Sequence, residues 1–276
     1  MSYRITILCD NSVGPMTGTL GEHGFAAFVE FGGGALLFDT GQGETLVNNA
    51  RRMGKNLCRT ERVILSHGHY DHTGGLKPLL QTCGSKEVLA HPSVFACRYR
   101  VKDTGESVAI GIPFGEAELL KLGATFDLSS SFREVGPGLF LTGEVPRRTP
   151  FEKGDSGLYC DEKGCNVDTL PDDQSLIINT GKGLVLLLGC CHAGLVNTMD
   201  LAREKTGVAE VYAVVGGTHL GFSSPAQLEE TIKALRGYGV RKLCVSHCTG
   251  FSAAARLSRE FPAEFHPAQV GYTLEV

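Results

Sequence analysis

The sequence predicts a layered α/β fold that forms a single domain of 276 residues. Three observations lead to this prediction. Short β-rich apolar runs alternate with helical patterns in both halves of the chain, and glycines separate most of them. The length is sufficient for a large core. A mean hydropathy near zero, with 20% charged residues, is typical of a folded globular chain and excludes a disordered one.

The individual elements follow from this alternation. In the first half, strands are expected at Arg4–Cys9, Phe25–Phe31, Ala35–Asp39, Arg62–Ser66 and Glu87–Ala90. In the second half they are expected at Gly138–Thr142, Ser175–Asn179, Leu184–Leu188, Glu210–Val215, Lys242–Ser246 and Gln269–Glu275. The run Leu184–Leu188 is apolar throughout, as in a strand that is covered on both faces.

Four helices are expected, at Glu44–Met53, Leu195–Thr206, Pro225–Tyr238 and Ala253–Phe261. The third has a clear start, with Ser224 as N-cap and proline at the first helical position. Residues 92–174 differ from the rest because they are rich in glycine, proline and charge and show weak periodicity. We expect them to form an inserted cap or loop region within the single domain 1–276, covering the functional site.

Charge and cysteine usage restrict the partners. The chain has 26 basic and 30 acidic side chains and no basic stripe, which argues against nucleic acid as the main partner. No apolar run approaches the roughly 20 residues of a membrane-spanning helix. The N-terminal residues lack signal-peptide features, so a cytoplasmic location is expected. The ten cysteines are then expected to be reduced thiols, buried groups or metal ligands. Whether the chain forms a homo-oligomer stays open.

A dense cluster of metal-ligand residues follows one strand. After Val63–Ser66 the chain reads His67-Gly68-His69-Tyr70-Asp71-His72, with two glycines soon after. Two histidines that are two positions apart in an extended segment point to the same side and can share one metal. Asp71 and His72 follow where the chain turns, so they can reach a second site. The spacing differs from that of a zinc-protease helix, which places histidines at i and i+4.

This motif resembles the signature of the metallo-β-lactamase superfamily, and in particular the branch of 7,8-dihydropterin-6-methyl-4-(β-D-ribofuranosyl)aminobenzene 5′-phosphate synthases and their relatives. The resemblance rests on Asp10-Asn11, Glu22-His23-Gly24, Asp39-Thr40-Gly41, Ser66–Leu76, 189–194, 216–220 and 246–250. These stretches span nearly the whole chain. The resemblance implies a four-layered αββα sandwich and one or two bound zinc ions, with iron or manganese as alternatives.

The resemblance also implies ligands. His67 and His69 match ligands of the first metal, Asp71 and His72 match ligands of the second, and His247 completes the second site. In many relatives an aspartate follows the strand that corresponds to Leu184–Gly189 and bridges the metals. This sequence has Cys190 there, followed by Cys191 and His192. Either His192 or the Cys190 thiolate supplies the missing ligand. We favour His192, because an imidazole keeps the site suited to hydrolysis.

Other residues are candidates for substrate contacts. His219 is expected on the same rim as His192, where it would hold the substrate or stabilise charge on the leaving group. Asp71, besides ligating, would orient a water whose pKa the metal lowers from about 15.7 to about 7. Arg147 and Arg148 could clamp a phosphate. The N-terminus of the helix at Leu195–Thr206 would add a partial positive charge beside the metals.

The sequence therefore predicts a metal-dependent hydrolase or transferase acting on a small anionic substrate, which is phosphorylated or pterin-related if the branch resemblance extends to the reaction. Two alternatives stay open. One is an iron-dependent persulfide oxygenase of the same fold; the flavodiiron version is disfavoured, because that pattern has a glutamate in place of His69. The other is a non-catalytic, metal-stabilised module that binds an anionic metabolite.

Overall fold

Two seven-stranded sheets face each other in the computed structural model, which describes residues 2–60 and 62–276. In spatial order, the first sheet contains β17 (Thr273–Glu275), β1 (Tyr3–Cys9), β2 (Ala26–Phe31), β3 (Gly34–Phe38), β4 (Arg62–Ile64), β5 (Lys86–Ala90) and β8 (Ala124–Leu128). The second contains β16 (Phe265–Pro267), β15 (Lys242–Ser246), β14 (Val211–Gly217), β13 (Gly183–Leu188), β12 (Leu176–Thr180), β10 (Leu139–Leu141) and β9 (Arg133–Gly136).

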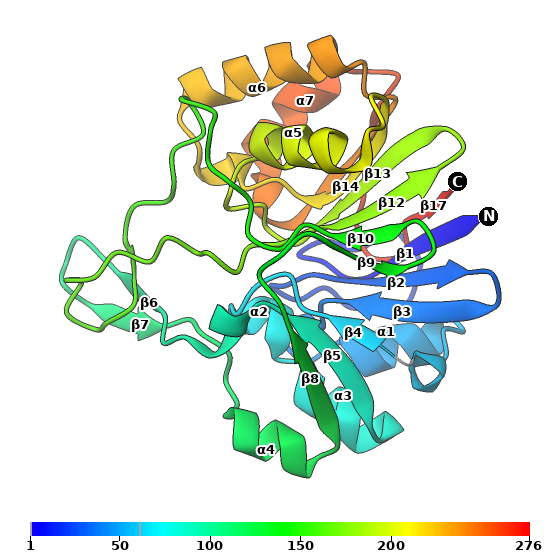
Figure 1. The fold of residues 1–276 in the computed structure, drawn as a ribbon, viewed down its shortest axis with the longest axis vertical. Helices are drawn as coiled ribbons and strands as arrows, with labels where there is room; N and C mark the ends of the chain where they lie inside the picture. Colours follow the sequence, from blue (N-terminus) through cyan, green and yellow to red (C-terminus); the bar gives the residue numbers. More distant parts are fainter. Residues whose placement is uncertain (1, 61) are drawn as a thin grey trace.

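Helices cover the outer face of each sheet (Figure 1). The first sheet is covered by α1 (Leu46–Arg52), α3 (Leu76–Cys83) and α4 (Glu116–Lys121), and α2 (Tyr70–Thr73) is a single turn beside the site. The second sheet is covered by α5 (Leu195–Thr206), α6 (Pro225–Tyr238) and α7 (Gly250–Glu260). The layers therefore run helix, sheet, sheet, helix, and the αββα sandwich expected from the sequence is confirmed.

Alternating side chains of the strands divide the core into three layers. Ile5 and Ile7 of β1 point between the sheets, while Leu8 contacts the helices outside the first sheet. The expected run Leu184–Leu188 is β13, which is buried on both faces because it contributes to the inner core and to the layer under α5. None of the helices in the described ranges is long and apolar enough to cross a membrane.

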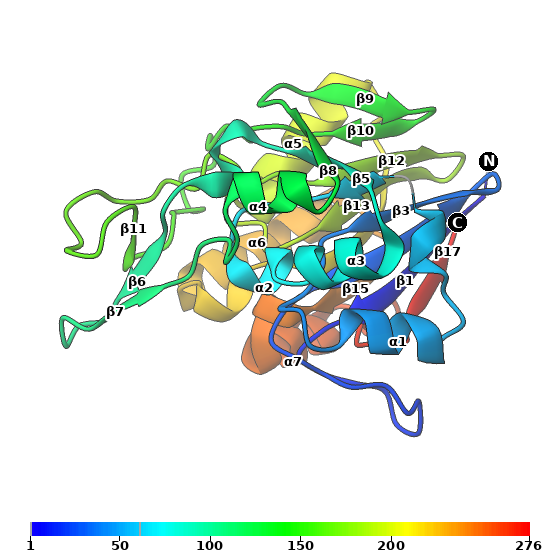
Figure 2. The same cartoon turned by 90° about the horizontal axis from the view of Figure 1, so that it is seen from below.

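The expectation that residues 92–174 are only a cap is wrong in part. A small three-stranded sheet of β6 (Tyr99–Val101), β7 (Ser107–Ala109) and β11 (Leu158–Tyr159) does form an arm that extends from the body (Figure 2). However, β8 is an edge strand of the first sheet, and β9 and β10 end the second. Of these, β10 corresponds to the expected strand Gly138–Thr142, whereas β8 and β9 were not expected, because their partly exposed faces hide the alternation that would have identified them.

The expectation of reduced cysteines is also wrong at one pair. Cys58 and Cys83 form a disulfide that ties the turn before β4 to the end of α3. The other eight cysteines are free, and Cys160 and Cys165 are exposed, as expected for a surface loop. The helix α3 is not among the expected helices, because it has only 8 residues, contains Pro78 and begins directly after the glycine pair.

Candidate metal centre

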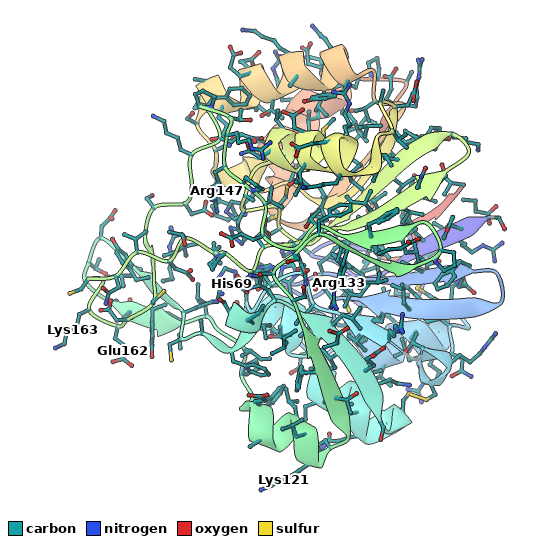
Figure 3. All side chains as sticks on the ribbon, viewed as in Figure 1. His69, Lys121, Arg133, Arg147, Glu162 and Lys163 are labelled. Carbon is teal, nitrogen blue, oxygen red and sulfur yellow. A yellow bond between two sulfur atoms is a disulfide. The ribbon has the colours of Figure 1, made fainter. Side chains whose placement is uncertain are left out.

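The candidate ligands gather at one edge of the sandwich, where strands of both sheets end. Figure 3 shows one of them, His69. His67 follows β4 of the first sheet. His192 follows β13, His219 follows β14 and His247 follows β15, all in the second sheet. Because β13, β14 and β15 are parallel neighbours, their carboxyl ends meet at the same edge. Asp71 and His247, which are 176 positions apart in the sequence, thus meet at this edge.

Three buried histidines form a first cluster. His67 Nε2 lies 3.0 Å from His69 Nδ1, and the rings of His67 and His192 have centroids 5.0 Å apart. One ligand nitrogen from each of these three residues lies within 4.8 Å of the other two. The structure therefore brings His192 to the pair that the sequence assigned to the first metal.

A carboxylate and three imidazoles form a second cluster. Asp71 Oδ2 lies 3.4 Å from His247 Nε2 and 3.6 Å from His72 Nε2. A third imidazole, from His23, places its Nε2 3.2 Å from the same oxygen. Asp71, His72 and His247 are the residues that the sequence assigned to the second metal, and the structure places them side by side. It adds His23, which has no ligand-like spacing from the other histidines in the sequence.

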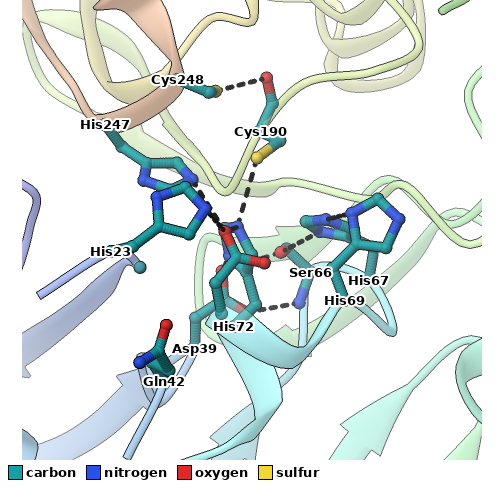
Figure 4. Close-up of polar contacts among 12 residues, drawn as sticks. His23, Asp39, Gln42, Ser66, His67, His69, His72, Cys190, His247 and Cys248 are labelled. Atoms are coloured by element: carbon teal, nitrogen blue, oxygen red, sulfur yellow. Dashed lines mark hydrogen bonds and ion pairs between the residues drawn. The ribbon is translucent and has the colours of Figure 1, made fainter. Parts of the chain in front are cut away.

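Polar groups behind the ligands orient their rings (Figure 4). Asp39 Oδ2 lies 2.7 Å from His72 Nδ1 and accepts a 2.7 Å hydrogen bond from Ser66 Oγ. Ser66 Oγ also lies 2.9 Å from His67 Nδ1. Since Asp39 can only accept, Nδ1 of His72 carries the proton; Ser66, which donates to Asp39, accepts from His67 Nδ1. In their neutral forms, both rings therefore direct an Nε2 without a proton into the centre.

These residues fit a divalent metal. The Nε2 atoms of His69 and His192 are buried without a hydrogen-bond partner among the described residues, and such groups are costly unless they are satisfied. Burial, together with the neighbouring imidazoles, holds the pKa of His67 and of His69 well below the usual histidine range. Both rings are therefore neutral at physiological pH, the form in which imidazole binds metals. Nitrogen and carboxylate donors are a set that zinc favours.

Both alternatives for the missing ligand lie at the centre, but in different places. His192 belongs to the first cluster. Cys190 Sγ lies 3.2 Å from His72 Nε2 and groups with His67 and His72, between the two clusters. Burial raises the pKa of the Cys190 thiol well above its usual value. Without a metal the sulfur is therefore a neutral thiol.

His219 lies on the same rim, as expected, and an aspartate that the sequence analysis missed holds it there. Asp155 Oδ1 lies 2.8 Å from His219 Nε2, and Asp155 Oδ2 lies 2.7 Å from His192 Nδ1. Burial lowers the pKa of His219, but Asp155 and Cys248 outweigh it and raise that pKa to about 10. Asp155 comes from the loop before β11, where nothing in the local pattern distinguishes it from other surface acids.

The expected arginine clamp is not formed. Arg147 donates to the carbonyl oxygens of His192, at 2.5 Å, and Thr169, at 3.0 Å. Arg148 points outward to an ion pair with Glu204. Arg147 is thus a structural support behind His192, and the substrate-binding expectation for both arginines is corrected.

The expected anion site at the start of α5 is already filled. Buried Glu152 accepts hydrogen bonds from Val196 N at 2.7 Å and Asn197 N at 2.8 Å. Position 194 requires a glycine, because a Cβ there would lie 2.3 Å from Glu152 Oε2. The free N–H groups of this helix therefore anchor the loop 150–156 and do not face a substrate.

A cavity of about 610 Å³ opens beside the first cluster, and both His192 and His219 line it. Its walls include Phe151 and Phe222, and the Phe222 ring stacks on His219 with centroids 4.7 Å apart. Arg100 and Lys153 add two cationic side chains. The wall also contains the acidic residues Glu152, Asp155 and Glu230. A cavity with apolar walls and a few polar groups suits a small molecule.

Comparisons with known proteins agree with this geometry. The family model described as "Metallo-beta-lactamase superfamily" matches residues 20–189. A protein of Methanocaldococcus jannaschii named 7,8-dihydropterin-6-methyl-4-(beta-D-ribofuranosyl)-aminobenzene-5'-phosphate synthase is 32% identical, with 98% of this chain and 95% of that protein aligned. A solved metal-dependent hydrolase of the beta-lactamase superfamily has a TM-score of 0.85 at 31% identity, with 99% of both chains covered. A metallo-beta-lactamase fold protein from Bacillus subtilis, at 12% identity and a TM-score of 0.59, shares the fold.

Proposed function

The chain belongs to the metallo-β-lactamase superfamily, and from that premise we propose that it is a zinc-dependent enzyme that hydrolyses or transfers a group of a small anionic substrate. One observation carries the proposal. His192 is at once a member of the first ligand cluster and part of the wall of the 610 Å³ cavity. A molecule in that cavity would therefore lie directly beside the metal.

The ligands have defined tasks in this proposal. His67, His69 and His192 hold the first metal, and Asp71, His72 and His247 hold the second. When bound, such metals supply Lewis acidity, which polarises a phosphoryl or carbonyl oxygen and activates a nucleophile at neutral pH.

The cavity residues bind and orient the substrate. His219, paired with Asp155 and therefore protonated at neutral pH, places a positive charge beside the ligands. Arg100 and Lys153 add charge on the cavity wall. The acidic wall residues Glu152, Asp155 and Glu230 already have partners at the start of α5, in His219 and in Lys233, respectively. Arg100 and Lys153 therefore favour a phosphate or carboxylate group, and the ring of Phe222 offers a flat apolar surface.

Group transfer is proposed as well as hydrolysis because of the Methanocaldococcus jannaschii relative. Its name describes a synthase that makes a pterin-containing aminobenzene phosphate. Both reactions use the same electrostatics, since each replaces a leaving group at a polarised centre. The nucleophile, water or an amine-bearing second substrate, distinguishes them.

The test combines metal analysis with a substrate panel of phosphoesters, lactones and pterin phosphates. We expect the wild type to turn over at least one anionic substrate, and His67→Ala to lose the first metal and the activity. Arg100→Ala should raise KM by about 10-fold with metal content unchanged, because it removes a cation that binds substrate and no metal ligand. Arg148→Ala is the matched control, since its guanidinium pairs with Glu204 outside the cavity.

Three outcomes would contradict the proposal. Full metal occupancy without turnover of any panel member would favour the metabolite-binding module. Iron as the bound metal, with oxygen uptake on persulfides, would favour the oxygenase. An equal rise in KM for Arg100→Ala and Arg148→Ala would remove the cavity from the proposed substrate site.

A further inference from the structure

His23 is the unexpected member of the second cluster. Its side chain is 53% exposed, whereas the other residues around Asp71 Oδ2 are buried. Its Nε2 is also the imidazole nitrogen nearest to that oxygen, at 3.2 Å, compared with 3.4 Å for His247. The distances alone would make His23 as good a metal ligand as His247.

The side-chain amide of Asn11 contacts both imidazoles, His23 with one end and His247 with the other. Asn11 Oδ1 accepts a hydrogen bond from Gly24 N at 3.2 Å and lies 2.9 Å from His247 Nδ1. The other end of the amide, Nδ2, lies 3.4 Å from His23 Nδ1. The bond from Gly24 N fixes which end is which, because a backbone N–H must face the oxygen of the amide.

This orientation places the proton on opposite nitrogens of the two rings. His247 Nδ1 faces an amide oxygen, so it carries the proton and its Nε2 is unprotonated. His23 Nδ1 faces an amide N–H, so it accepts, and in the neutral ring the proton lies on Nε2. That proton points at Asp71 Oδ2, and a protonated nitrogen cannot bind a metal.

We propose that Asn11 gives His23 and His247 opposite tautomers, so that His247 is a ligand of the second metal and His23 is a positioning residue that donates Nε2–H to Asp71. His23 thereby holds the carboxylate oxygen that the metal centre uses. The role at the metal rests on the proposed function, but the tautomers belong to the metal-free protein.

The first experiment measures the tautomers directly. Histidine ring ¹⁵N shifts are recorded for the metal-free protein at a pH where both rings are neutral, and His23→Gln and His247→Gln assign the signals. We expect His23 to carry its proton on Nε2 and His247 on Nδ1. Two rings in the same tautomer would overturn the proposal, even if the protein proved to bind no metal at all.

A variant of Asn11 tests the cause. Asn11→Asp replaces the amide N–H with a second acceptor, so His23 should carry a proton on Nδ1 as well as on Nε2, which still faces Asp71, while His247 keeps its tautomer. A His23 Nδ1 that stays unprotonated in this variant would remove Asn11 from the mechanism.

Metal binding tests the role of His23. His23→Gln keeps an N–H donor that can reach Asp71, so metal stoichiometry and the absorption spectrum of the cobalt-substituted protein should match the wild type. His23→Ala, which removes that donor, should weaken the second site by about 10-fold, the usual effect of losing a partner behind a ligand. His247→Ala should lose the second metal. A loss of metal in His23→Gln equal to that in His247→Ala would show that His23 is a ligand and would overturn the proposal.

Discussion

Each buried imidazole of this centre offers the nitrogen that its surroundings leave free. His72, His192 and His247 direct Nδ1 to Asp39, Asp155 and Asn11, respectively. Their Nε2 atoms all turn inward. Because the partners are acceptors that cannot give a proton to Nδ1, the ligand set is organised before a metal arrives.

Single substitutions separate the two candidates for the missing ligand. We predict that His192→Ala loses about one metal per chain, because the first cluster has only three imidazoles, and a ligand contributes far more affinity than a group behind it. Cys190→Ser should keep most of the metal and activity. Metal analysis and the absorption spectrum of the cobalt-substituted protein are the measurements. A sulfur-to-cobalt band that disappears in Cys190→Ser, with His192→Ala still metallated, would assign the ligand to Cys190.

The pH dependence of metal binding should differ between the two sites. Burial lowers the pKa of His72, but the carboxylates of Asp71 and Asp39 outweigh it and raise the pKa to about 9. Below that pH His72 must release a proton before it can bind a metal. The second-site affinity should therefore rise by about 10-fold per pH unit from pH 7 towards 9 and then level off.

His67 and His69 have lowered pKa values, so they hold no proton to displace in this range, and the first site should change little. Calorimetric titration at several pH values measures both affinities and the protons released. An equal pH dependence at both sites would contradict the assignment of His72 to the second metal.

At the scale of secondary structure, the site is built from strand ends with strained backbones. Asp39, Cys191, His219 and His247 all have positive φ, between 52° and 62°, although none is glycine. Such residues cost about 1–3 kcal/mol each and persist only where surrounding contacts hold them. In each case the turn redirects the chain just past β3, β13, β14 or β15 and aims the following atoms at the centre.

Gly189, just after β13, lies close to Ser66, just after β4, and this contact can be used to test how the ligands are positioned. A Cβ on Gly189 would lie 2.1 Å from Ser66 Oγ and 2.9 Å from Asp39 Oδ2. Gly189→Ala should therefore destabilise the fold by about 1–3 kcal/mol, and it should weaken metal binding by about 10–100-fold because it displaces the Asp39–Ser66 pair.

The control is Gly181→Ala in the turn between β12 and β13, where a Cβ would have no heavy atom within 4 Å. Denaturant titration and metal analysis of both variants measure the effects. Equal stability and equal metal content in the two variants would show that the Asp39–Ser66 pair does not position the ligands.

At the scale of the whole molecule, the candidate ligands connect the two sheets. His67, His69, Asp71 and His72 follow β4 of the first sheet, and His192 and His247 follow β13 and β15 of the second. The loop 150–156, anchored on α5 by Glu152, adds Asp155 from outside the sandwich. A bound metal would therefore join three separate parts of the chain.

Chelation should consequently destabilise the entire fold. With free metal at about 100 times its dissociation constant, binding contributes about 2.7 kcal/mol. For a chain of this size, that corresponds to a fall in Tm of roughly 5–10 °C when the metal is removed. Thermal melts with and without a chelator measure the change. A double variant, His67→Ala with His247→Ala, is the control, because it lacks a ligand of each site and its Tm should be the same with and without the chelator.

The sequence by itself determined the layered architecture and the core of the metal centre. A continuous apolar run such as that of β13 identifies a buried strand without tertiary information, since burial on both faces requires apolar residues throughout. The motif from His67 to His72 is equally local, because all four side chains belong to one strand end and the turn after it. For these features the physical cause and the pattern lie in the same short segment.

Only the tertiary structure decided which distant groups complete the site. Asn11, His23 and Asp155 lie in loops whose local sequence has no periodicity, and their roles arise from contacts with residues up to 236 positions away. The same holds for Arg147 and Glu152. Arg147 supports His192, and Glu152 binds the start of α5, although the sequence had suggested substrate contacts for Arg147 and for this helix end. A hydrogen bond between distant residues depends on how the whole chain packs. The local pattern therefore identifies the groups that can ligate a metal, and the packing decides which nitrogen, which charge and which neighbour each of them has.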